Sequence, residues 1–386
     1  MVDYTPHQAH QLKITALTLN NFRNYKKLVL KPLGDLSIFV GENAIGKTSI
    51  IEAIQLLTEL QSFRATHAGE LINWNKEEAS VLVEISDGER QLEEQLIIQD
   101  NKRQYYFQGK PKRIQDLKGL LPAVVFTPDN LDLVKGSYSK RRDAIDNLGI
   151  QLSQNFYNVR ADYQKLIKQK NQSLKDEANK TFIESINEVL VKVGVQYIML
   201  RFSLLDSFCP YLKQYYQGIT EGKEDISLQY QLSWGGDYIS EFFQVNKDIL
   251  TQEFIKALED NFEKERESKR CKIGPHADHI DFFIKPATEE NFRNASIYAS
   301  QGQQRSVVLA FKMAELKTIQ EMLQQKPVLL LDDVMSELDE ARRSMFMELI
   351  QGDIQTFITT TNLAYFNDSI INQANIYTLP FEGAQA

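Results

Sequence analysis

G-E-N-A-I-G-K-T, at residues Gly41 to Thr48, is the stretch of sequence that decides the fold. A mostly apolar run, Leu36 to Val40, precedes it, and apolar residues of helical spacing begin at Ile50. A strand, a glycine-containing loop and a helix in this order are the context that a phosphate-binding loop requires. Backbone N–H groups of the loop and the helix N-terminus then converge on one anion, and only glycine lets the backbone wrap so closely around it.

The residue types in this loop predict how it would hold a nucleotide. Lys47 is expected to reach the terminal phosphates, and the hydroxyl of Thr48 to bind a magnesium ion. A glycine-rich turn with an exposed lysine is the alternative, which the flanking strand and helix disfavour. The loop residues predicted to bind ATP are Gly41, Glu42, Asn43, Ala44, Ile45, Gly46, Lys47, Thr48 and Ser49.

A second half of the site is expected where a buried strand ends in two acids. The apolar residues Val328 to Leu331 lead directly into Asp332 and Asp333. A magnesium carboxylate is expected at the carboxyl end of a strand that neighbours the loop. Asp332 is therefore predicted to bind the magnesium ion directly or through water, and Asp333 to polarise or deprotonate the attacking water. Many strands end in an acid, so the two acids indicate a magnesium site only in combination with the phosphate loop. The predicted catalytic residues are Lys47, Asp332 and Asp333.

A serine-capped helix is predicted upstream of the acids. S-Q-G-Q-Q-R, at Ser300 to Arg305, precedes an apolar helical pattern that begins at Val307. A serine N-cap with glycine in the first turn presents N–H groups and a hydroxyl, which makes a second anion-binding helix end. This motif is weak by itself. Downstream of the acids, S-E-L-D at Ser336 to Asp339 is followed by an apolar strand around Phe357 and by Thr359 to Thr361.

Strand patterns dominate the first third of the chain. Residues 1–11 are expected to be a loose leader, and alternation from Leu12 predicts a strand. Residues 81–108 alternate again around the turn signal Asp87–Gly88, which predicts an antiparallel hairpin or small sheet. A further apolar run spans Leu120 to Phe126.

Helical patterns dominate the middle of the chain. One apolar stripe from Ile145 to Leu166 and a second from Phe182 to Phe208 are separated by the polar stretch Lys168 to Lys180. Together they predict an antiparallel helical hairpin that is too short for a long coiled coil. Thr181 and Glu184 are placed for a capping box, and Pro210 is expected to stop the second helix.

The middle region is expected to close with less regular structure. Residues 217–247 are polar and mixed, a third helix is predicted around Phe254 to Phe262, and Ile280 to Ile284 is expected to be a strand.

Composition excludes several classes of protein. No apolar run approaches the roughly 18 residues of a membrane span, and the first residues lack the features of a signal peptide. Cys209 and Cys271 are too few for a disulfide framework or a zinc site, so a cytoplasmic protein is expected. The net charge of −8 argues against indiscriminate nucleic-acid binding but leaves room for a local basic face. The basic clusters that could form one are Lys102–Arg103, Lys110 with Lys112 and Arg113, Lys135 with Lys140 to Arg142, and Lys264 to Lys272.

The order of these motifs resembles the ABC-type ATPase heads of the structural-maintenance and DNA-repair class. It is more closely similar to the RecF family of bacterial recombination mediators, over residues 12 to 365. The motifs that carry this resemblance are F-R-N-Y at 22–25, the phosphate loop, S-F-R at 62–64, F-T-P-D-N-L-D-L-V-K-G at 126–136, Arg141–Arg142, G-P-H at 274–276, S-Q-G-Q-Q-R and L-L-L-D-D-V-M-S-E-L-D.

The resemblance implies an α/β fold: an ABC-type P-loop ATPase head with a mixed sheet, and a mainly helical second lobe that carries a short antiparallel arm. The expected divisions are 1–135 for the first part of the ATPase lobe, 136–295 for the helical lobe and arm, and 296–386 for the remaining part of the head.

The resemblance also implies that two heads sandwich two ATP molecules, so an ATP-dependent homodimer is expected. The cap residues Ser300, Gln301, Gly302 and Gln303 would contact the nucleotide of the other subunit, and Asp339 would cross the interface. Arg23 and Asn24 would lie along the nucleotide, and Arg64 would act near the phosphates or DNA.

Two positions depart from the family pattern. G-P-H is usually followed by arginine and two acids, but Ala277, Asp278 and His279 follow it here. The histidine that transport-type ABC proteins place behind the acids is absent, and Thr360 and Thr361 stand there instead. A structural role is expected for His276.

The function implied is that of an ATP-gated DNA clamp in replication, recombinational repair and the SOS response to DNA damage. ATP would close the dimer on duplex DNA or on single-strand/duplex junctions, and slow, DNA-stimulated hydrolysis would reopen it. The resemblance adds loading of the RecA recombinase at gaps, with RecO and RecR as partners and no membrane.

Two other functions share some of these sequence motifs. A transport-energising ATPase subunit is disfavoured by the missing histidine and the long helical insertion. An ATP-dependent nuclease of the overcoming-lysogenisation type would need a separate acidic metal-binding domain, for which the roughly 25 residues after Thr361 are expected to leave no room.

Overall fold

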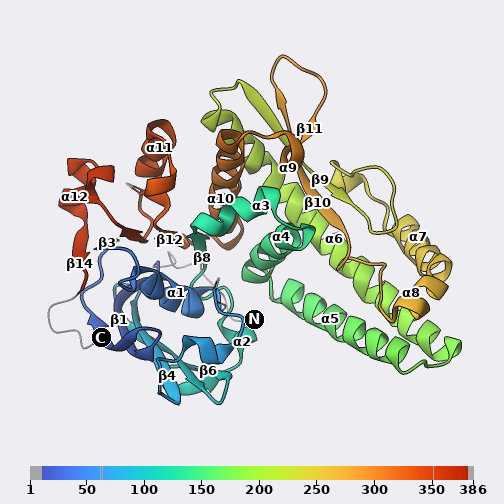
Figure 1. Ribbon diagram of the computed structural model, residues 1–386, viewed down its shortest axis with the longest axis horizontal. Helices are drawn as coiled ribbons and strands as arrows, with labels where there is room; N and C mark the ends of the chain where they lie inside the picture. Colours follow the sequence, from blue (N-terminus) through green and yellow to red (C-terminus); the bar gives the residue numbers. More distant parts are fainter. Residues whose placement is uncertain (1–10, 61, 63, 351, 381–386) are drawn as a thin grey trace, which may run out of the picture. The chain divides into compact units, whose positions relative to one another are not determined.

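The computed structural model describes residues 11–60, 62, 64–350 and 352–380 of the chain (Figure 1). The predicted leader at 1–11 therefore lies almost wholly outside the described residues. Two compact units result: Met1–Asn130 with Ile319–Ala386 forms the first, and Leu131–Thr318 forms the second. The predicted divisions at 135/136 and 295/296 stay a prediction about functional lobes.

A six-stranded antiparallel sheet forms one layer of the first unit, in the order β2-β1-β4-β5-β6-β7. Its inward positions alternate along each strand, so one face is apolar, and the predicted small sheet over 81–108 is confirmed as its middle. The strands are β1 (Lys13–Phe22), β2 (Tyr25–Leu30), β4 (Glu78–Ser86), β5 (Gln91–Gln99), β6 (Lys102–Phe107) and β7 (Lys110–Lys112).

A five-stranded parallel sheet forms the other layer, in the order β14-β3-β13-β12-β8. Strands β12 and β13 at its centre are buried along their whole length, and β12 is a continuous apolar run up to Asp332. The helix α1 (Lys47–Thr58) packs against strands of both sheets. The strands are β3 (Leu36–Val40), β8 (Ala123–Phe126), β12 (Val328–Asp332), β13 (Thr356–Thr360) and β14 (Asn375–Thr378).

Short helical elements complete the first unit. They are η1 (Ala68–Leu71), α2 (Ile114–Leu117), η2 (Pro128–Leu131), η4 (Val334–Glu337), α11 (Glu340–Ile350), η5 (Leu363–Tyr365) and α12 (Asp368–Gln373).

Helices dominate the second unit, as the sequence predicts. In Figure 1, α5 and α6 run side by side as the predicted antiparallel hairpin. A three-stranded antiparallel sheet, β11-β10-β9, packs against α4 and α6. The elements are α3 (Asp132–Lys135), α4 (Tyr138–Leu152), α5 (Gln154–Lys175), α6 (Lys180–Ile219), β9 (Glu224–Gln231), η3 (Phe242–Gln244), α7 (Lys247–Asp260), α8 (Phe262–Ser268), β10 (His279–Pro286), β11 (Arg293–Asn294), α9 (Ala295–Tyr298) and α10 (Gln301–Leu323), which ends in the first unit.

The ends of three helices differ from the prediction. The stripe predicted to run from Ile145 to Leu166 breaks at Ser153, whose hydroxyl accepts a hydrogen bond from the N–H of Phe156 and starts α5. The predicted capping box of Thr181 and Glu184 is wrong because Asn179 caps α6, accepting from the N–H of Phe182 at 2.8 Å. Polar residues 168–175, predicted to interrupt the hairpin, belong to α5.

Pro210 lies inside α6 and does not stop it. A proline in a helix interior costs about 3 kcal/mol because it removes a hydrogen bond and crowds the preceding turn. Leu212 and Tyr216, beyond the proline, are both buried and continue the apolar stripe, so their packing offsets this cost. The strand β9 is absent from the prediction, although Ile226, Leu228 and Tyr230 alternate across it.

None of the helices in the described part of the chain has the length and apolar character that a bilayer crossing requires.

Glu94 is an unpaired acid in the core of the antiparallel sheet. Its side chain is 1% exposed, on β5 between Val83 of β4 and Phe107 of β6, and neither carboxylate oxygen has a hydrogen-bond partner. Burial raises the pKa of Glu94 to about 8, because the charged form is poorly solvated there.

This acid should make stability depend on pH. The folded chain keeps Glu94 protonated up to about pH 8, whereas the unfolded carboxyl ionises near pH 4.5. The free energy of unfolding should therefore fall between pH 5 and 8, by up to about 1.4 kcal/mol per pH unit from this group. We expect urea unfolding of Glu94→Gln to lose less stability over this range, and the exposed neighbour variant Glu93→Gln to behave as wild type. Equal pH dependence in Glu94→Gln and wild type would contradict the assignment.

Candidate nucleotide-binding site

The predicted loop lies between β3 and α1 and needs glycine at its last turn. Gly46 has φ +110°, a left-handed conformation, and a Cβ there would lie 2.3 Å from Nδ2 of Asn24. Asn24 itself donates to the carbonyl of Ile45 at 3.2 Å. The turn between β1 and β2 therefore packs directly against the loop and restricts its backbone conformation.

Lys47 begins α1 with its ammonium folded against the loop. Its Nζ donates to the carbonyls of Gly41 at 2.7 Å and Glu42 at 2.6 Å. Burial lowers the pKa of Lys47, while the charges of Asp333 and Asp332 act in the opposite direction. A cation is thus held beside the helix N-terminus, where both favour an anionic ligand.

Thr48 and Asp332 are brought together, as the sequence predicts. The Thr48 hydroxyl donates to Oδ1 of Asp332 at 3.0 Å, joining the loop to the end of β12. The same carboxylate oxygen accepts from the hydroxyl of Thr359 on β13 at 2.7 Å. Burial raises the pKa of Asp332, and these two hydrogen bonds lower it.

The chemistry of Thr48 and Asp332 fits a magnesium ion. Mg²⁺ prefers hard oxygen ligands and is usually held by one or two protein groups together with water and substrate phosphates. In the described ranges no cluster of three or more acidic, histidine or cysteine side chains could enclose a metal by itself. The protein supplies a hydroxyl and a carboxylate, which suits an ion that arrives with a polyphosphate.

Asp333 is held in an unusual conformation with one free oxygen. Its φ is +52°, and its N–H donates to the Thr359 hydroxyl at 3.0 Å. Its Oδ1 is buried and has no hydrogen-bond partner. Burial raises the pKa of Asp333, Lys47 lowers it, and Asp332 raises it. This oxygen is an available proton acceptor beside the phosphate loop.

Thr359 positions both acids, a role that the sequence analysis does not assign. Its hydroxyl donates to Asp332 and accepts from the N–H of Asp333. The signal was present in the threonines that follow the apolar strand, but the pairing of β12 with β13 is needed to interpret it.

Arg23 is fixed by contacts that the sequence analysis does not predict. Its guanidinium binds both carboxylate oxygens of Glu52, a buried residue of α1, at 2.8 and 2.6 Å. It also donates to the carbonyl of Glu70 at 2.7 Å. Arg23 lines the pocket, and these hydrogen bonds also connect the β1–β2 turn to α1 and η1.

The loop, the acids and the β1–β2 turn surround an open pocket of about 910 Å³. Most of the predicted loop residues line it, whereas Gly41, Glu42 and Ile45 do not. Pocket residues that the sequence analysis does not assign come from η1, the loop after it and the T-P-D turn after β8. The lining consists of Arg23, Asn24, Asn43, Ala44, Gly46, Lys47, Thr48, Ser49, Arg64, Gly69, Glu70, Ile72, Trp74, Thr127, Pro128, Asp129, Asp332 and Asp333.

The predicted serine cap is confirmed, and it belongs to the second unit. Ser300 Oγ accepts from the N–H of Gln303 at 3.2 Å, and the Gln303 side chain accepts from the N–H of Ser300 at 2.8 Å. This capping box starts α10, whose first residues include Gln301 and Gly302. The pocket takes its lining from the first unit alone.

Asp339 belongs to the first unit but is not among the pocket residues. Its Oδ1 accepts from the N–H of Arg342 at 3.0 Å, and its carboxylate pairs with the Arg342 guanidinium. It therefore caps α11 in this structure.

The G-P-H segment is held inside the second unit. His276 contacts the Tyr163 hydroxyl at 2.7 Å and the Cys271 carbonyl at 3.2 Å, and burial lowers its pKa to about 4. This agrees with the structural role predicted for it. Asp278, one of the departures from the family pattern, is buried and accepts from the Tyr230 hydroxyl at 2.6 Å.

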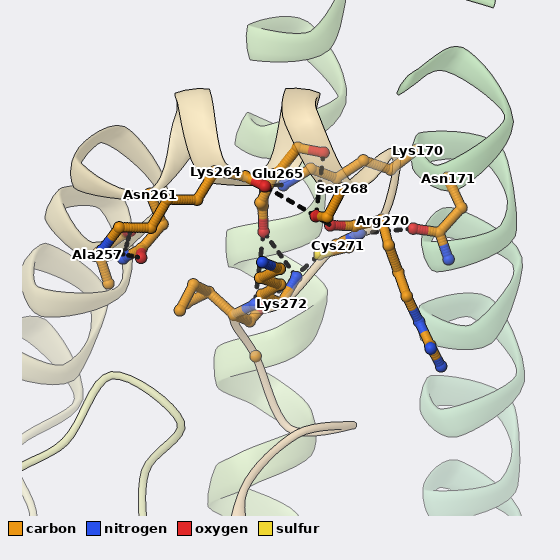
Figure 2. Close-up of polar contacts among 12 residues, drawn as sticks. Lys170, Asn171, Ala257, Asn261, Lys264, Glu265, Ser268, Arg270, Cys271 and Lys272 are labelled. Carbon is orange, nitrogen blue, oxygen red and sulfur yellow. Dashed lines mark hydrogen bonds and ion pairs between the residues drawn. The ribbon is translucent and has the colours of Figure 1, made fainter. Parts of the chain in front are cut away.

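One of the four basic clusters contains a buried basic side chain, whereas the lysines and arginines of the segment 264–272 are exposed. Arg141 is 3% exposed and pairs with buried Asp281 at 3.1 Å, so it is excluded from a surface groove. Figure 2 shows the segment 264–272, where Lys170 pairs with Glu265 at 2.6 Å and Glu265 accepts from the N–H of Lys272 at 2.8 Å. This buried pair anchors the segment after α8 to α5.

Comparison with known proteins decides the family. The profile described as the RecF/RecN/SMC N-terminal domain matches residues 13–379. A DNA replication and repair protein RecF of Staphylococcus aureus is 33% identical over 374 residues, which is 95% of this chain and 98% of that protein. The chain belongs to the RecF family. Its function is therefore in DNA replication and repair, as predicted.

Solved structures confirm the predicted ABC-type ATPase head fold. A structure described as the recombination mediator protein RecF with ATP in the RecFOR pathway has a TM-score of 0.81 and 26% identity, covering 91% of this chain and 94% of that one. An SMC head bound to the winged-helix domain of ScpA has a TM-score of 0.53 at 16% identity, covering 95% and 93%, and shares the fold alone.

Thr359→Val should test the positioning role of Thr359. Valine keeps the shape but leaves Asp332 without one hydrogen bond and the N–H of Asp333 without its side-chain acceptor. We expect magnesium-dependent ATP hydrolysis to fall by about 10- to 100-fold, the range for residues that support metal ligands, with a smaller loss in ATP affinity.

Thr360→Val is the matched control, because the Thr360 hydroxyl donates to the carbonyl of Asn362 and accepts from its N–H, away from both acids. Stopped-flow hydrolysis and calorimetric ATP titration would be measured for both variants. Equal losses in the two variants would show that Thr359 acts only through strand packing.

Proposed function

We propose that this chain is an ATP-gated DNA clamp of recombinational repair, with ATP and Mg²⁺ as cofactors. ATP would close a homodimer on duplex DNA or on single-strand/duplex junctions, and weak, DNA-stimulated hydrolysis would reopen it. The observation that carries this proposal is the constellation of Lys47, Thr48, Asp332 and the unpartnered oxygen of Asp333 around one pocket.

Each group has a defined task in hydrolysis. The Lys47 ammonium would exchange the two loop carbonyls for phosphate oxygens and offset their charge. Thr48 and Asp332 would hold the magnesium ion, which neutralises charge on the transferring phosphate. Asp333 Oδ1 would orient the attacking water and accept its proton, because its raised pKa makes it a better base than an exposed aspartate.

In the proposed clamp a second copy supplies the serine cap, which is not among the residues that line the pocket. Ser300 and Gln301 are exposed at the N-terminus of the 23-residue helix α10, where N–H groups and the helix dipole favour an anion. In a two-fold dimer, each cap would reach the γ-phosphate in the partner's pocket. Asp339 would then exchange its contact with Arg342 for one across the interface.

The proposed partners follow from the relatives. A matching structure is described as part of the RecFOR pathway, and we propose RecO-type and RecR-type mediators as partners, with loading of RecA at gaps in the cytoplasm. DNA would be held through phosphate contacts, so its affinity should fall steeply with salt. Exposed lysines such as Lys102 and Lys110 remain candidates for such contacts, unlike Arg141.

Mixing two inactive variants tests whether the site is shared between copies. Lys47→Ala removes the loop cation, and Ser300→Arg blocks the cap, so each homodimer should be inactive. A mixed dimer retains one intact loop facing one intact cap. Equal amounts that pair at random should therefore recover up to about a quarter of wild-type ATP hydrolysis. No recovery above the separate variants would contradict completion of the site by a second copy.

Sedimentation with and without ATP tests gating. Lys47→Ala should neither bind ATP nor dimerise, whereas Asp333→Asn should bind ATP and remain a dimer because hydrolysis is blocked. Lys26→Ala, at an exposed position on β2, is the control and should dimerise as wild type. ATP-dependent dimerisation that survives in Lys47→Ala would overturn the proposed gate.

A further inference from the structure

The rim of the pocket carries a large aromatic side chain that the phosphate chemistry does not use. Trp74 lines the pocket, and its side chain is 88% exposed. It follows η1 on the way to β4. The other tryptophan, Trp234, stacks on Phe254 with ring centroids 5.0 Å apart. Trp74 therefore leaves a large apolar surface in water at the mouth of a ligand site.

The backbone beside Trp74 is anchored, although its side chain is exposed. Ile72 forms an antiparallel bridge with Phe22. Asn73 donates its N–H to the carbonyl of Asn21 at 2.7 Å and its side-chain amide to the carbonyl of Arg23 at 2.6 Å. The indole is thus presented from a segment fixed to the end of β1.

Arg23 connects this rim to the phosphate end of the pocket. Its guanidinium binds Glu52 on α1 and the carbonyl of Glu70 in η1, while its own carbonyl receives Asn73. The helix α1 begins with Lys47. Trp74 and the phosphate-binding residues are therefore held by one hydrogen-bonded frame, which keeps their spacing constant.

A nucleotide has one charged end and one flat aromatic end, and the pocket lining contains side chains of both kinds. Lys47, Thr48, Asp332 and Asp333 match the charged end, whereas Ile72 and Trp74 are the large apolar side chains of the lining. Aromatic rings bind nucleic-acid bases by stacking. We propose that Trp74 is the platform on which the base of the bound nucleotide stacks, an inference that rests on the proposed nucleotide site.

Stacking determines how Trp74 contributes to the binding affinity for a nucleotide. Every base has a π-face, so a stacked indole adds affinity without selecting among bases. A flat ring at this position should suffice, and Phe should replace Trp with little loss. Binding of a polyphosphate that has no base should be independent of Trp74.

The test uses the full chain with Trp234→Phe, which leaves Trp74 as the single tryptophan. Its fluorescence and calorimetric binding are measured with magnesium ATP and with magnesium tripolyphosphate, which has no base. ATP should change the emission of Trp74 and tripolyphosphate should not. Adding Trp74→Ala should weaken ATP binding by about 5- to 150-fold and leave tripolyphosphate affinity unchanged, while Trp74→Phe should stay near the parent. Phe243→Ala, at an exposed aromatic residue of η3, is the matched control.

Different failures have different meanings. Equal weakening of ATP and tripolyphosphate in Trp74→Ala, or ATP binding without a change in Trp74 emission, would overturn the stacking role and leave the nucleotide site intact. An absence of ATP binding in the parent, or ATP binding that survives Lys47→Ala, would overturn the nucleotide site and the stacking role with it.

Discussion

One carboxylate oxygen organises the site. Oδ1 of Asp332 accepts hydrogen bonds from the hydroxyls of Thr48 and Thr359, which come from the phosphate loop and from β13. Three elements distant in sequence are therefore joined at a single atom that is nearly buried. These two hydrogen bonds lower the pKa of Asp332, whereas burial raises it. The neighbouring Asp333 shows the contrast, with one oxygen left without a partner.

A second frame holds the loop from the other side. Gly46 leaves room for Asn24, and Arg23 extends from the same turn to Glu52 on α1. Burying Glu52 would be costly without a partner, and the bidentate contact with Arg23 supplies one. The residues that hold the loop therefore also satisfy buried polar groups, as Arg23 does for Glu52. Binding groups on such a scaffold need little reorganisation when a ligand binds.

The sequence predicted those features whose geometry depends on residues that are adjacent in the chain. The loop, the acid-ended strand β12 and the Ser300 cap are short motifs whose geometry follows from adjacent residues. Thr359 could not be assigned because its role depends on the register between β12 and β13. The prediction that Pro210 ends α6 was wrong for the same reason, because the packing of Leu212 and Tyr216 depends on the tertiary structure. Arg141 looked like a surface cation, and only the fold places it beside Asp281.

The strand order of the parallel sheet has a consequence for synthesis of the chain on the ribosome. The early strands β3 and β8 are separated in the sheet by β12 and β13, which begin more than two hundred residues after β8 ends. The unit 131–318 is continuous in sequence and is synthesised while β3 and β8 still lack their neighbours β12, β13 and β14. Exposed edges invite pairing with other chains, so the emerging protein must be protected from aggregation until β13 fills the gap. Chains released before β12 would lack both the complete parallel sheet and its acids.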